Sequence, residues 1–174
     1  MVLSIAVVVV IMLLAVGATG LCTYGRDTAE HGPVQVADAA QFLSQEARSA
    51  NHEVRLPEVP DGWVCNSARR RLIGEESLQV VGWLTPDQKG YVQLTQTGLP
   101  TDQIVAKFDQ YERTLSRTET RGGHEVGIYS GTDKDIEDLW VVDLPGERLV
   151  FSGVSRDQDM RTIIDATLAA QPLV

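Results

Sequence analysis

The first 21 residues lack charged side chains altogether, and only Ser4 and Thr19 among them are polar. Because a helix rises about 1.5 Å per residue, this stretch would span roughly the 30 Å hydrocarbon core of a bilayer. A cleaved signal peptide has a basic start and an apolar run of about 7–15 residues, and this stretch fits neither criterion. A lipoprotein signal needs a small residue before its cysteine, whereas Leu21 precedes Cys22. We therefore predict an uncleaved transmembrane anchor over residues 1–21, with a cleaved signal peptide as the alternative.

Basic residues are scarce on the flank that follows this stretch. Arg26 is the only Lys or Arg between residue 22 and Arg48. Since Lys and Arg within about 15–20 residues of a span favour the cytoplasmic side, a flank this poor in them is expected to be exported. We expect the amino terminus in the cytoplasm and the following domain outside it, in the cell envelope.

Lysine is also rare, and acidic residues outnumber basic ones. The chain has 15 Lys and Arg residues against 24 Asp and Glu residues, which gives a formal net charge of -9. An acidic domain is repelled by nucleic acids and by anionic lipid surfaces, which argues against both as main partners. The chain has two cysteines, Cys22 at the membrane boundary and Cys65 in a strand-like run. We expect both thiols to be unpaired.

Motifs for catalysis, cofactors and metals are missing from the sequence. It contains no phosphate-binding glycine loop and no dinucleotide-binding fingerprint. Residues 127–131 read Gly-Ile-Tyr-Ser-Gly, one position away from the Gly-x-Ser-x-Gly elbow of hydrolases, and precede a loop rather than a helix. His31, His52 and His124 are scattered, without a second ligand at metal spacing. We assign no catalytic, cofactor-binding or metal-binding residue, and we expect a protein that is not an enzyme and carries no cofactor.

Composition divides the rest of the chain into three parts. Residues 22–35 are polar and contain glycine and proline, so they are predicted to be a flexible linker. Residues 36–55 are predicted to form a short helix and a connection, in which Asp38 and Gln41 have the spacing of a helix start. Residues 56–174 are predicted to form one extracytoplasmic α+β domain, because this length allows one hydrophobic core.

Apolar periodicity predicts the elements of this domain. The expected strands are about ten residues from Trp63, then 77–85, 91–97, 124–129, 139–144 and 148–154. One expected helix is capped by Thr101 and has an apolar stripe from Ile104 to Leu115, and a second one follows at 160–168. Leu-Gln-Val-Val at 78–81 resembles Leu-Trp-Val-Val at 139–142, a weak internal similarity compatible with two β-β-β-α halves. After an N-terminal transmembrane helix we therefore predict an α+β fold, an antiparallel sheet of six to seven strands covered by helices on one face.

Four short motifs follow the span and the alanine-rich helix in a fixed order. They are Leu-Pro-x-x-Pro-x-Gly-Trp at 56–63, Val-Gly-Trp-Leu-Thr-Pro at 81–86, Tyr-Val at 91–92 and Val-Phe-Ser-Gly at 150–153. This order resembles the actinobacterial, membrane-anchored domain-of-unknown-function family DUF4245 over nearly the whole chain. The resemblance implies a single-pass envelope protein of an actinobacterium. It carries over no activity and no site residues.

An acidic cluster has both a functional and a structural interpretation. Asp133, Asp135, Glu137 and Asp138 carry the oxygen ligands that calcium prefers. A helix-loop-helix calcium site needs Gly at its sixth position and Glu at its twelfth, where this chain has Asp138 and Leu144. The sequence favours a solvated hairpin loop.

The arginine run and the three tryptophans also have both a functional and a structural interpretation. Residues 69–71 are three consecutive arginines, which would suit a phosphate or carboxylate on a partner or would pair with acidic residues across strands. Trp63, Trp83 and Trp140 would suit the floor of a sugar-binding groove, but their places at strand starts or in apolar runs favour the core.

We interpret the chain as a single-pass, membrane-anchored protein of the cell envelope and a non-catalytic protein-interaction module. Its expected partners are the membrane, through the N-terminal helix, and an envelope protein of unknown identity, with no nucleic acid. The alternative is an extracytoplasmic carrier of a lipid or other apolar ligand, and an enzyme comes third. A large enclosed apolar pocket would favour the carrier, whereas an exposed apolar patch would favour the interaction module.

Overall fold

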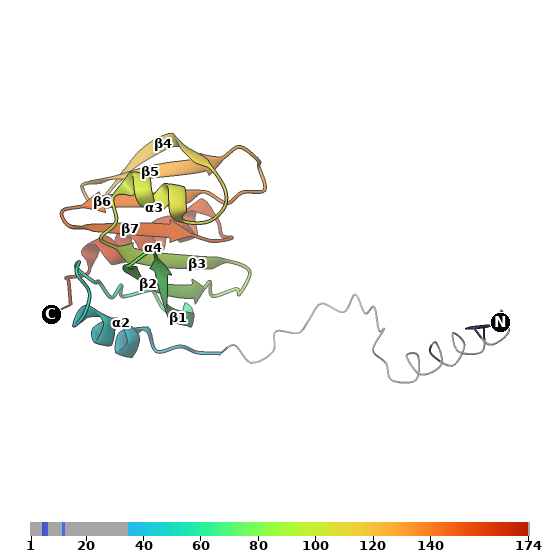
Figure 1. Ribbon diagram of the computed structural model, residues 1–174. Helices are drawn as coiled ribbons and strands as arrows, with labels where there is room; N and C mark the ends of the chain where they lie inside the picture. The colour runs from blue at the N-terminus through green and yellow to red at the C-terminus, as the bar shows by residue number, and fades with distance from the viewer. Residues whose placement is uncertain (1–4, 7–11, 13–34, 174) are drawn as a thin grey trace. The chain divides into compact units, whose positions relative to one another are not determined.

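The computed structural model describes residues 5, 6, 12 and 35–173 (Figure 1). The predicted anchor at 1–21, apart from residues 5, 6 and 12, and the predicted linker at 22–35, apart from residue 35, lie outside the described residues. Within the described part of the chain, no helix is both long and apolar enough to cross a membrane. Residues 35–174 form one compact unit.

This unit is built on a single antiparallel sheet of seven strands, in the order β1-β2-β3-β7-β6-β5-β4. Two meanders, β1-β2-β3 and β4-β5-β6-β7, meet where β3 pairs with β7. The strands are β1 (Val64–Ile73), β2 (Glu76–Leu84), β3 (Tyr91–Thr97), β4 (Arg113–Arg121), β5 (His124–Gly131), β6 (Leu139–Leu144) and β7 (Glu147–Ser152). The predicted α+β class and the antiparallel sheet are confirmed.

Three helices pack on the sheet: α2 (Ala39–Ala47), α3 (Thr101–Lys107) and α4 (Asp157–Ala169). The predicted start of α2 is confirmed, because the carboxylate of Asp38 accepts a hydrogen bond from the backbone N–H of Gln41 at 2.8 Å. The predicted cap of α3 is wrong, because Pro100 holds the cap position and Thr101 is already helical.

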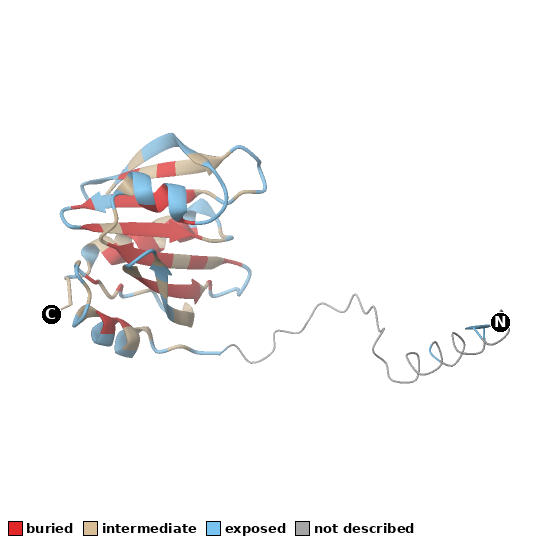
Figure 2. Cartoon of the chain, viewed as in Figure 1, coloured by how far each residue is buried: buried red, intermediate tan, exposed pale blue. Residues whose placement is uncertain are grey.

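The expected apolar stripe to Leu115 is also wrong in its second half. Helix α3 ends at Lys107, and Leu115 belongs to β4. Strand β4 was not among the predicted strands, because its sequence, Arg-Thr-Leu-Ser-Arg-Thr-Glu-Thr-Arg, has almost no apolar residues to alternate. Most of its side chains are exposed (Figure 2), since it forms one edge of the sheet. Its threonines still suit an extended, half-exposed strand.

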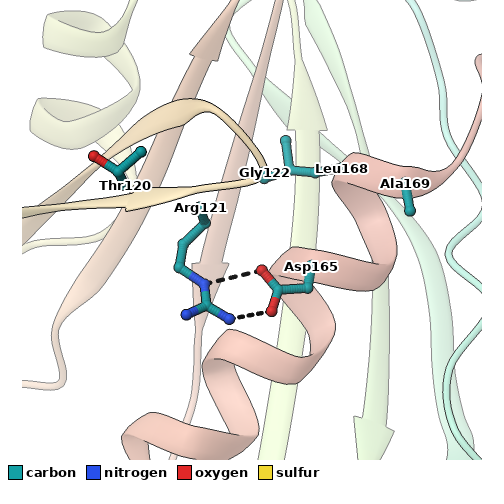
Figure 3. A pocket seen from close by; sticks show the side chains of 6 residues that line it. All are labelled: Thr120, Arg121, Gly122, Asp165, Leu168 and Ala169. Carbon is teal, nitrogen blue, oxygen red and sulfur yellow. Dashed lines mark hydrogen bonds and ion pairs between the residues drawn. The ribbon is translucent and has the colours of Figure 1, made fainter.

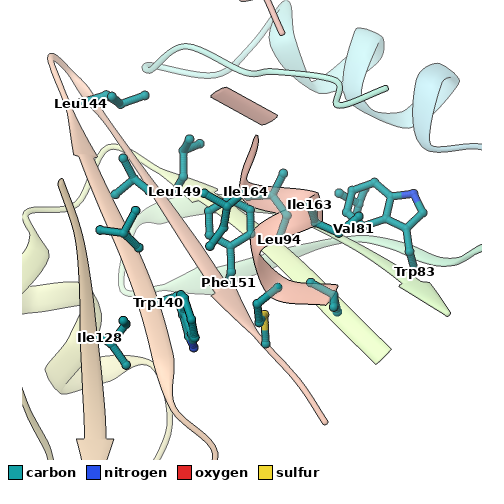
Figure 4. Packing of buried hydrophobic residues seen from close by; sticks show 14 of the residues in the cluster. Val81, Trp83, Leu94, Ile128, Trp140, Leu144, Leu149, Phe151, Ile163 and Ile164 are labelled. Carbon is teal, nitrogen blue, oxygen red and sulfur yellow. The ribbon is translucent and has the colours of Figure 1, made fainter. Parts of the chain in front are cut away.

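The larger hydrophobic core lies on the face of the sheet that α2 and α4 cover, and we call this the first face. Leu43 of α2 and Ile163 and Ile164 of α4 are fully buried there. They pack with side chains from β2, β3, β5, β6 and β7 that include Val81, Trp83, Leu94, Ile128, Trp140, Leu149 and Phe151 (Figure 4). The core therefore joins residues from 43 to 164 of the chain in one cluster.

The smaller core lies on the opposite, second face, under α3. Ile104, Val105 and Phe108 pack there against the remaining apolar residues of the strands, namely Leu78, Leu139, Val141 and Val150. The expectation that helices cover only one face of the sheet is thus incorrect, because α3 and α4 lie on opposite sides (Figure 1). Strands that are apolar on both faces need cover on both. Because 35–174 holds all seven strands and both cores, this unit has what a domain needs to fold alone.

The internal similarity holds for the strands and fails for the helices. Leu78 of β2 and Leu139 of β6 both point to the second face, and Val81 and Val142 both point to the first. Each three-stranded run ends in a helix, yet α3 packs on the second face and α4 on the first. The second meander also begins with an additional strand, β4.

Candidate functional site

A shallow hollow opens on the second face beside α3, over strands β4, β5 and β6. Its volume is about 280 Å³, and we call it the Tyr129 hollow. Its lining comprises Thr101, Leu115, Glu125, Gly127, Tyr129, Val141 and Asp143. The hollow opens to solvent and combines an apolar part with two carboxylates.

Strand alternation brings these residues together. Side chains two residues apart on a strand share a face, so Glu125, Gly127 and Tyr129 all belong to the second face of β5. The β5–β6 register places Gly127 opposite Val141, and the β4–β5 register places Leu115 opposite Tyr129. The centre of the hollow therefore lies over three adjacent strands.

Glycine at residue 127 lets the ring of Tyr129 and the side chain of Leu115 lie close over the strand at the floor of the hollow. A Cβ atom at this position would lie 3.0 Å from Cε2 of Tyr129 and 3.3 Å from Cδ1 of Leu115. Such distances are tighter than ordinary van der Waals contact, so a side chain here would push the ring of Tyr129 and Leu115 away from the strand. Leu115 stays 54% exposed and forms an apolar wall open to solvent.

The rim of the hollow is acidic. Continuation of the β5–β6 register by one residue places Glu125 opposite Asp143, on the same face. The Thr101 hydroxyl donates a hydrogen bond to Asp143 Oδ2 at 3.0 Å, and Nε of Arg148 lies 3.0 Å from Asp143 Oδ1. Glu125 is exposed and has no ion-pair partner in the described part of the chain.

The same surroundings change the pKa of the Tyr129 hydroxyl. Burial raises the pKa of Tyr129, and the charges of Asp143 and Glu125 raise it further. The hydroxyl therefore stays protonated over the physiological range and adds no negative charge. The charge of the hollow therefore comes from Glu125 and from Asp143, which is paired with Arg148.

A larger concavity of about 470 Å³ lies between the β4–β5 turn and the end of α4 (Figure 3). Its charged groups already satisfy each other, because Arg121 donates two hydrogen bonds to the carboxylate of Asp165, one of them at 2.9 Å from Nε. Leu168 and Gly122 form its wall. Because its charged lining residues are paired with each other, this concavity is a weaker candidate for binding a charged partner.

The acidic cluster of the β5–β6 connection lies at the surface, as the sequence favoured. Asp133 accepts a hydrogen bond from the backbone N–H of Asp135 at 3.2 Å, and Asp138 lies 3.7 Å from Arg117. Among the residues that the structure describes, no group of three or more His, Cys, Asp and Glu side chains is placed to hold a metal ion. These carboxylates do not converge on a common point.

The three consecutive arginines bind partners within the chain. Arg70 donates two hydrogen bonds to Glu46 of α2, at 2.8 and 2.6 Å, rather than pairing with an acidic residue across the strands. This pair lowers the pKa of Glu46. Arg69 binds Gln93 at 2.8 Å, and Arg71 donates to the carbonyl oxygen of Phe108.

Two of the three tryptophans are core residues. Trp83 and Trp140 are each 2% exposed, which confirms the structural interpretation for them. Trp63 is only partly buried and packs against the edge of the first core. The guanidinium groups of Arg117 and Arg161 lie 5.4 and 5.5 Å from the centroid of Trp140, so they close the ring off from solvent.

The profile of the family described as "Protein of unknown function (DUF4245)" matches residues 1–167. The chain belongs to this family. The resemblance inferred from the four short motifs is thereby confirmed. No curated protein and no solved structure matched the chain. The description of DUF4245 names no activity, ligand or partner, so a site in this DUF4245 protein has to be argued from its own residues.

Residues at the nucleophile-like motif and at Cys65 have the surroundings of structural groups. Ser130 donates its hydroxyl proton to Ser116 at 2.9 Å, and Ser116 in turn donates to the carbonyl oxygen of Ile128 at 3.0 Å. Burial raises the pKa of the Cys65 thiol, which keeps it protonated and poorly nucleophilic. Cys22 and His31 lie outside the described residues.

Two buried polar clusters had no signal in the sequence. The imidazole of His52 is fully enclosed, with Nδ1 at 3.0 Å from Oδ1 of Asn51 and 3.8 Å from a carboxylate oxygen of Glu76. Burial lowers the pKa of His52 below its usual range, although nearby Gln79 and Glu76 oppose the shift.

The second cluster holds the C-terminal tail. Arg55 donates to the fully buried carboxylate of Glu147 at 2.6 Å and to the carbonyl oxygen of Ala170 at 2.7 Å. Its backbone is also held by the side chain of Gln96 at 2.7 and 2.9 Å. Both clusters connect segments distant in sequence, so the spacing of their residues along the chain could not have predicted them.

Tyr129 and Gly127, which define the hollow, were likewise absent from the candidate residues. The sequence did contain one signal. Glu125, Gly127 and Tyr129 alternate along a strand, which places an acidic residue, a glycine and an aromatic residue on the same face. Without the strand partners that bring Leu115 and Val141 alongside, this pattern does not distinguish a hollow from an ordinary exposed strand.

Proposed function

We propose that this DUF4245 protein is a non-catalytic protein-interaction module of the cell envelope. In this proposal residues 1–21 anchor it as a single-pass protein, with the amino terminus in the cytoplasm and residues 35–174 outside. The uncharged length of residues 1–21 and the flank poor in Lys and Arg support this arrangement.

The Tyr129 hollow is the observation that carries the interaction role. Its apolar part joins Leu115, which is 54% exposed, to the partly buried ring of Tyr129 on the neighbouring strand. Glu125 adds a charge that has no partner within the described residues. Exposed apolar surface beside an unpaired charge is typical of a recognition surface rather than of a purely structural one.

The alternative, an extracytoplasmic carrier of a lipid or other apolar ligand, has weaker support. A carrier needs an enclosed apolar cavity, since an apolar ligand gains stability by leaving water. The four concavities described for this domain, of about 470, 210, 290 and 280 Å³, all open to solvent and include charged residues in their linings. They suit contact with another surface better than storage of a lipid.

A catalytic role also has little to support it. The Tyr129 hollow holds two carboxylates and a tyrosine that burial keeps protonated, without a nucleophile beside a base. His52, which would suit a general base, is enclosed away from this hollow beside Asn51 and Glu76.

Photo-crosslinking in intact membranes tests the proposal. We expect a photoreactive phenylalanine derivative in place of Leu115, in the full chain, to attach covalently to one specific protein. The same residue in place of Gln158, which is exposed on α4 across the sheet, is the matched control and should not. Attachment from neither position, or equally from both, would argue against a contact surface at the hollow.

Two further measurements separate the remaining alternatives. Native mass spectrometry of residues 35–174 is expected to show the protein alone, and stoichiometric lipid carried through purification would favour the carrier. Alkaline phosphatase, which is active only after export, should be active when fused to Val174. An expressed but inactive fusion would reverse the proposed topology.

A further inference from the structure

We propose that the Tyr129 hollow receives one lysine or arginine side chain from a basic segment of the partner protein. This inference rests on the proposed function, and it adds the chemical class of the partner. It follows from the combination of an acidic part and an apolar part in one hollow.

One of the two carboxylates of the hollow, that of Glu125, lacks a cation partner in the described part of the chain. Glu125 and Asp143 lie opposite each other on neighbouring strands, and like charges in this relation destabilise a sheet. Asp143 already has Arg148 and the hydroxyl of Thr101 beside it, but Glu125 has no ion pair in the described part of the chain. An incoming cation at Glu125 would relieve the repulsion instead of competing with an existing pair.

The apolar part of the hollow fits the stem of such a side chain. Lysine and arginine lay their methylene groups along apolar surface while the charged end stays near water or a carboxylate. Leu115, which is 54% exposed, and the partly buried ring of Tyr129 offer that surface where they lie side by side over Gly127. The face of an aromatic ring also attracts a cation within about 6 Å of its centroid.

Charge makes a basic protein segment a better occupant than the alternatives. The chain has a formal net charge of -9, so an acidic segment or an anionic membrane surface would be repelled at long range. A second copy of this chain would bring the same negative charge. A basic segment is attracted by both the whole domain and the hollow.

Nuclear magnetic resonance of residues 35–174 tests the inference with a defined probe. The probe is a nine-residue peptide of alternating lysine and valine, and its glutamate–valine counterpart is the control. We expect the lysine peptide to shift the amide signals of Glu125, Gly127 and Tyr129, and the glutamate peptide to leave them in place.

Matched variants locate the binding. Glu125→Gln removes one charge without changing shape and should weaken binding about fivefold, as for an ion pair of about 1 kcal/mol. Glu58→Gln, at an exposed acidic residue outside the hollow, should bind like the wild type. Gly127→Ala would displace the ring of Tyr129 and Leu115 and should also weaken binding, with the amide spectrum reporting that the fold is kept.

The outcomes separate this inference from the function on which it rests. No shift at these three amides up to about 1 mM lysine peptide, or equal weakening by the two glutamine variants, would overturn the basic-segment inference. If Leu115 still crosslinks to one protein in that case, the interaction role stands and only the partner class is wrong. A crosslinked partner peptide without lysine or arginine would likewise show that the partner class is wrong.

Discussion

Replacement of Trp140 by alanine should remove a large part of the stability of the domain. The indole is 2% exposed and packs in the first core with Ile128 and Phe151 (Figure 4). Its ring also lies beneath the guanidinium groups of Arg117 and Arg161, at 5.4 and 5.5 Å from the ring centroid. The substitution therefore deletes both core packing and the surface that holds two arginines.

The magnitude follows from these contacts. Deletion of a buried tryptophan costs about 3–5 kcal/mol, and each lost cation–π contact adds about 0.5–1 kcal/mol. Arg161 keeps its hydrogen bonds to Glu119 at 2.9 and 2.7 Å, and Arg117 keeps Asp157 at 3.2 Å, so neither charge is left alone. We expect a loss of about 4–7 kcal/mol in the free energy of unfolding, against a total of about 5–15 kcal/mol for a typical domain.

Urea denaturation of residues 35–174, followed by far-ultraviolet circular dichroism, measures this loss. Trp140→Phe keeps an aromatic ring of smaller volume and should cost about 1–2 kcal/mol, which gives a measurable value even where the alanine variant does not fold. A loss below about 1 kcal/mol for Trp140→Ala would refute the packing and show that the ring is dispensable to the first core.

Two further predictions concern Trp63 and His52. Trp63 is only partly buried, so Trp63→Ala should lower the free energy of unfolding by about 1.5–2.5 kcal/mol in the same assay, and a loss equal to that of Trp140→Ala would contradict the partial burial. Burial lowers the pKa of His52 in the folded state, so the imidazole binds a proton more readily in the unfolded chain. The contribution of neutral His52 to stability is therefore complete above about pH 6.5, the pKa of an unperturbed histidine, and is lost as the pH falls through the lower pKa of the folded state. His52→Gln should flatten the loss of stability between pH 7 and 5, whereas the exposed control His124→Gln should not, and identical slopes for wild type and His52→Gln would disprove the effect.

The fold could be predicted where side chains alternate or run apolar. Strand β2 has six successive buried residues, and its apolar run predicted a central strand. The sheet, its antiparallel order and the position of α2 all follow from signals of this local kind. Strand β4 lacks them, because the edge of a sheet needs no apolar residues and its charged side chains pair instead with α4, as Arg121 does with Asp165.

The placement of α3 could not be predicted for a different reason. Its apolar residues Ile104, Val105 and Phe108 would suit either face of the sheet equally well. The choice depends on what remains uncovered after α2 and α4 occupy the first face, which is a property of the whole domain. The apolar residues of β2 on both faces were the clue that a second layer was required.

The Tyr129 hollow lies where the second half of the sheet differs in structure from the first half. Helix α3 has 7 residues, whereas α4 has 13, so the second face receives the shorter cover. Strand β4 extends the sheet beyond the three strands that the two halves share, and Leu115 of this additional strand remains exposed beside Tyr129. A sheet of six strands would have ended at β5 and left no wall for the hollow. The same strand that broke the sequence repeat therefore provides the apolar side of the surface that we propose for binding.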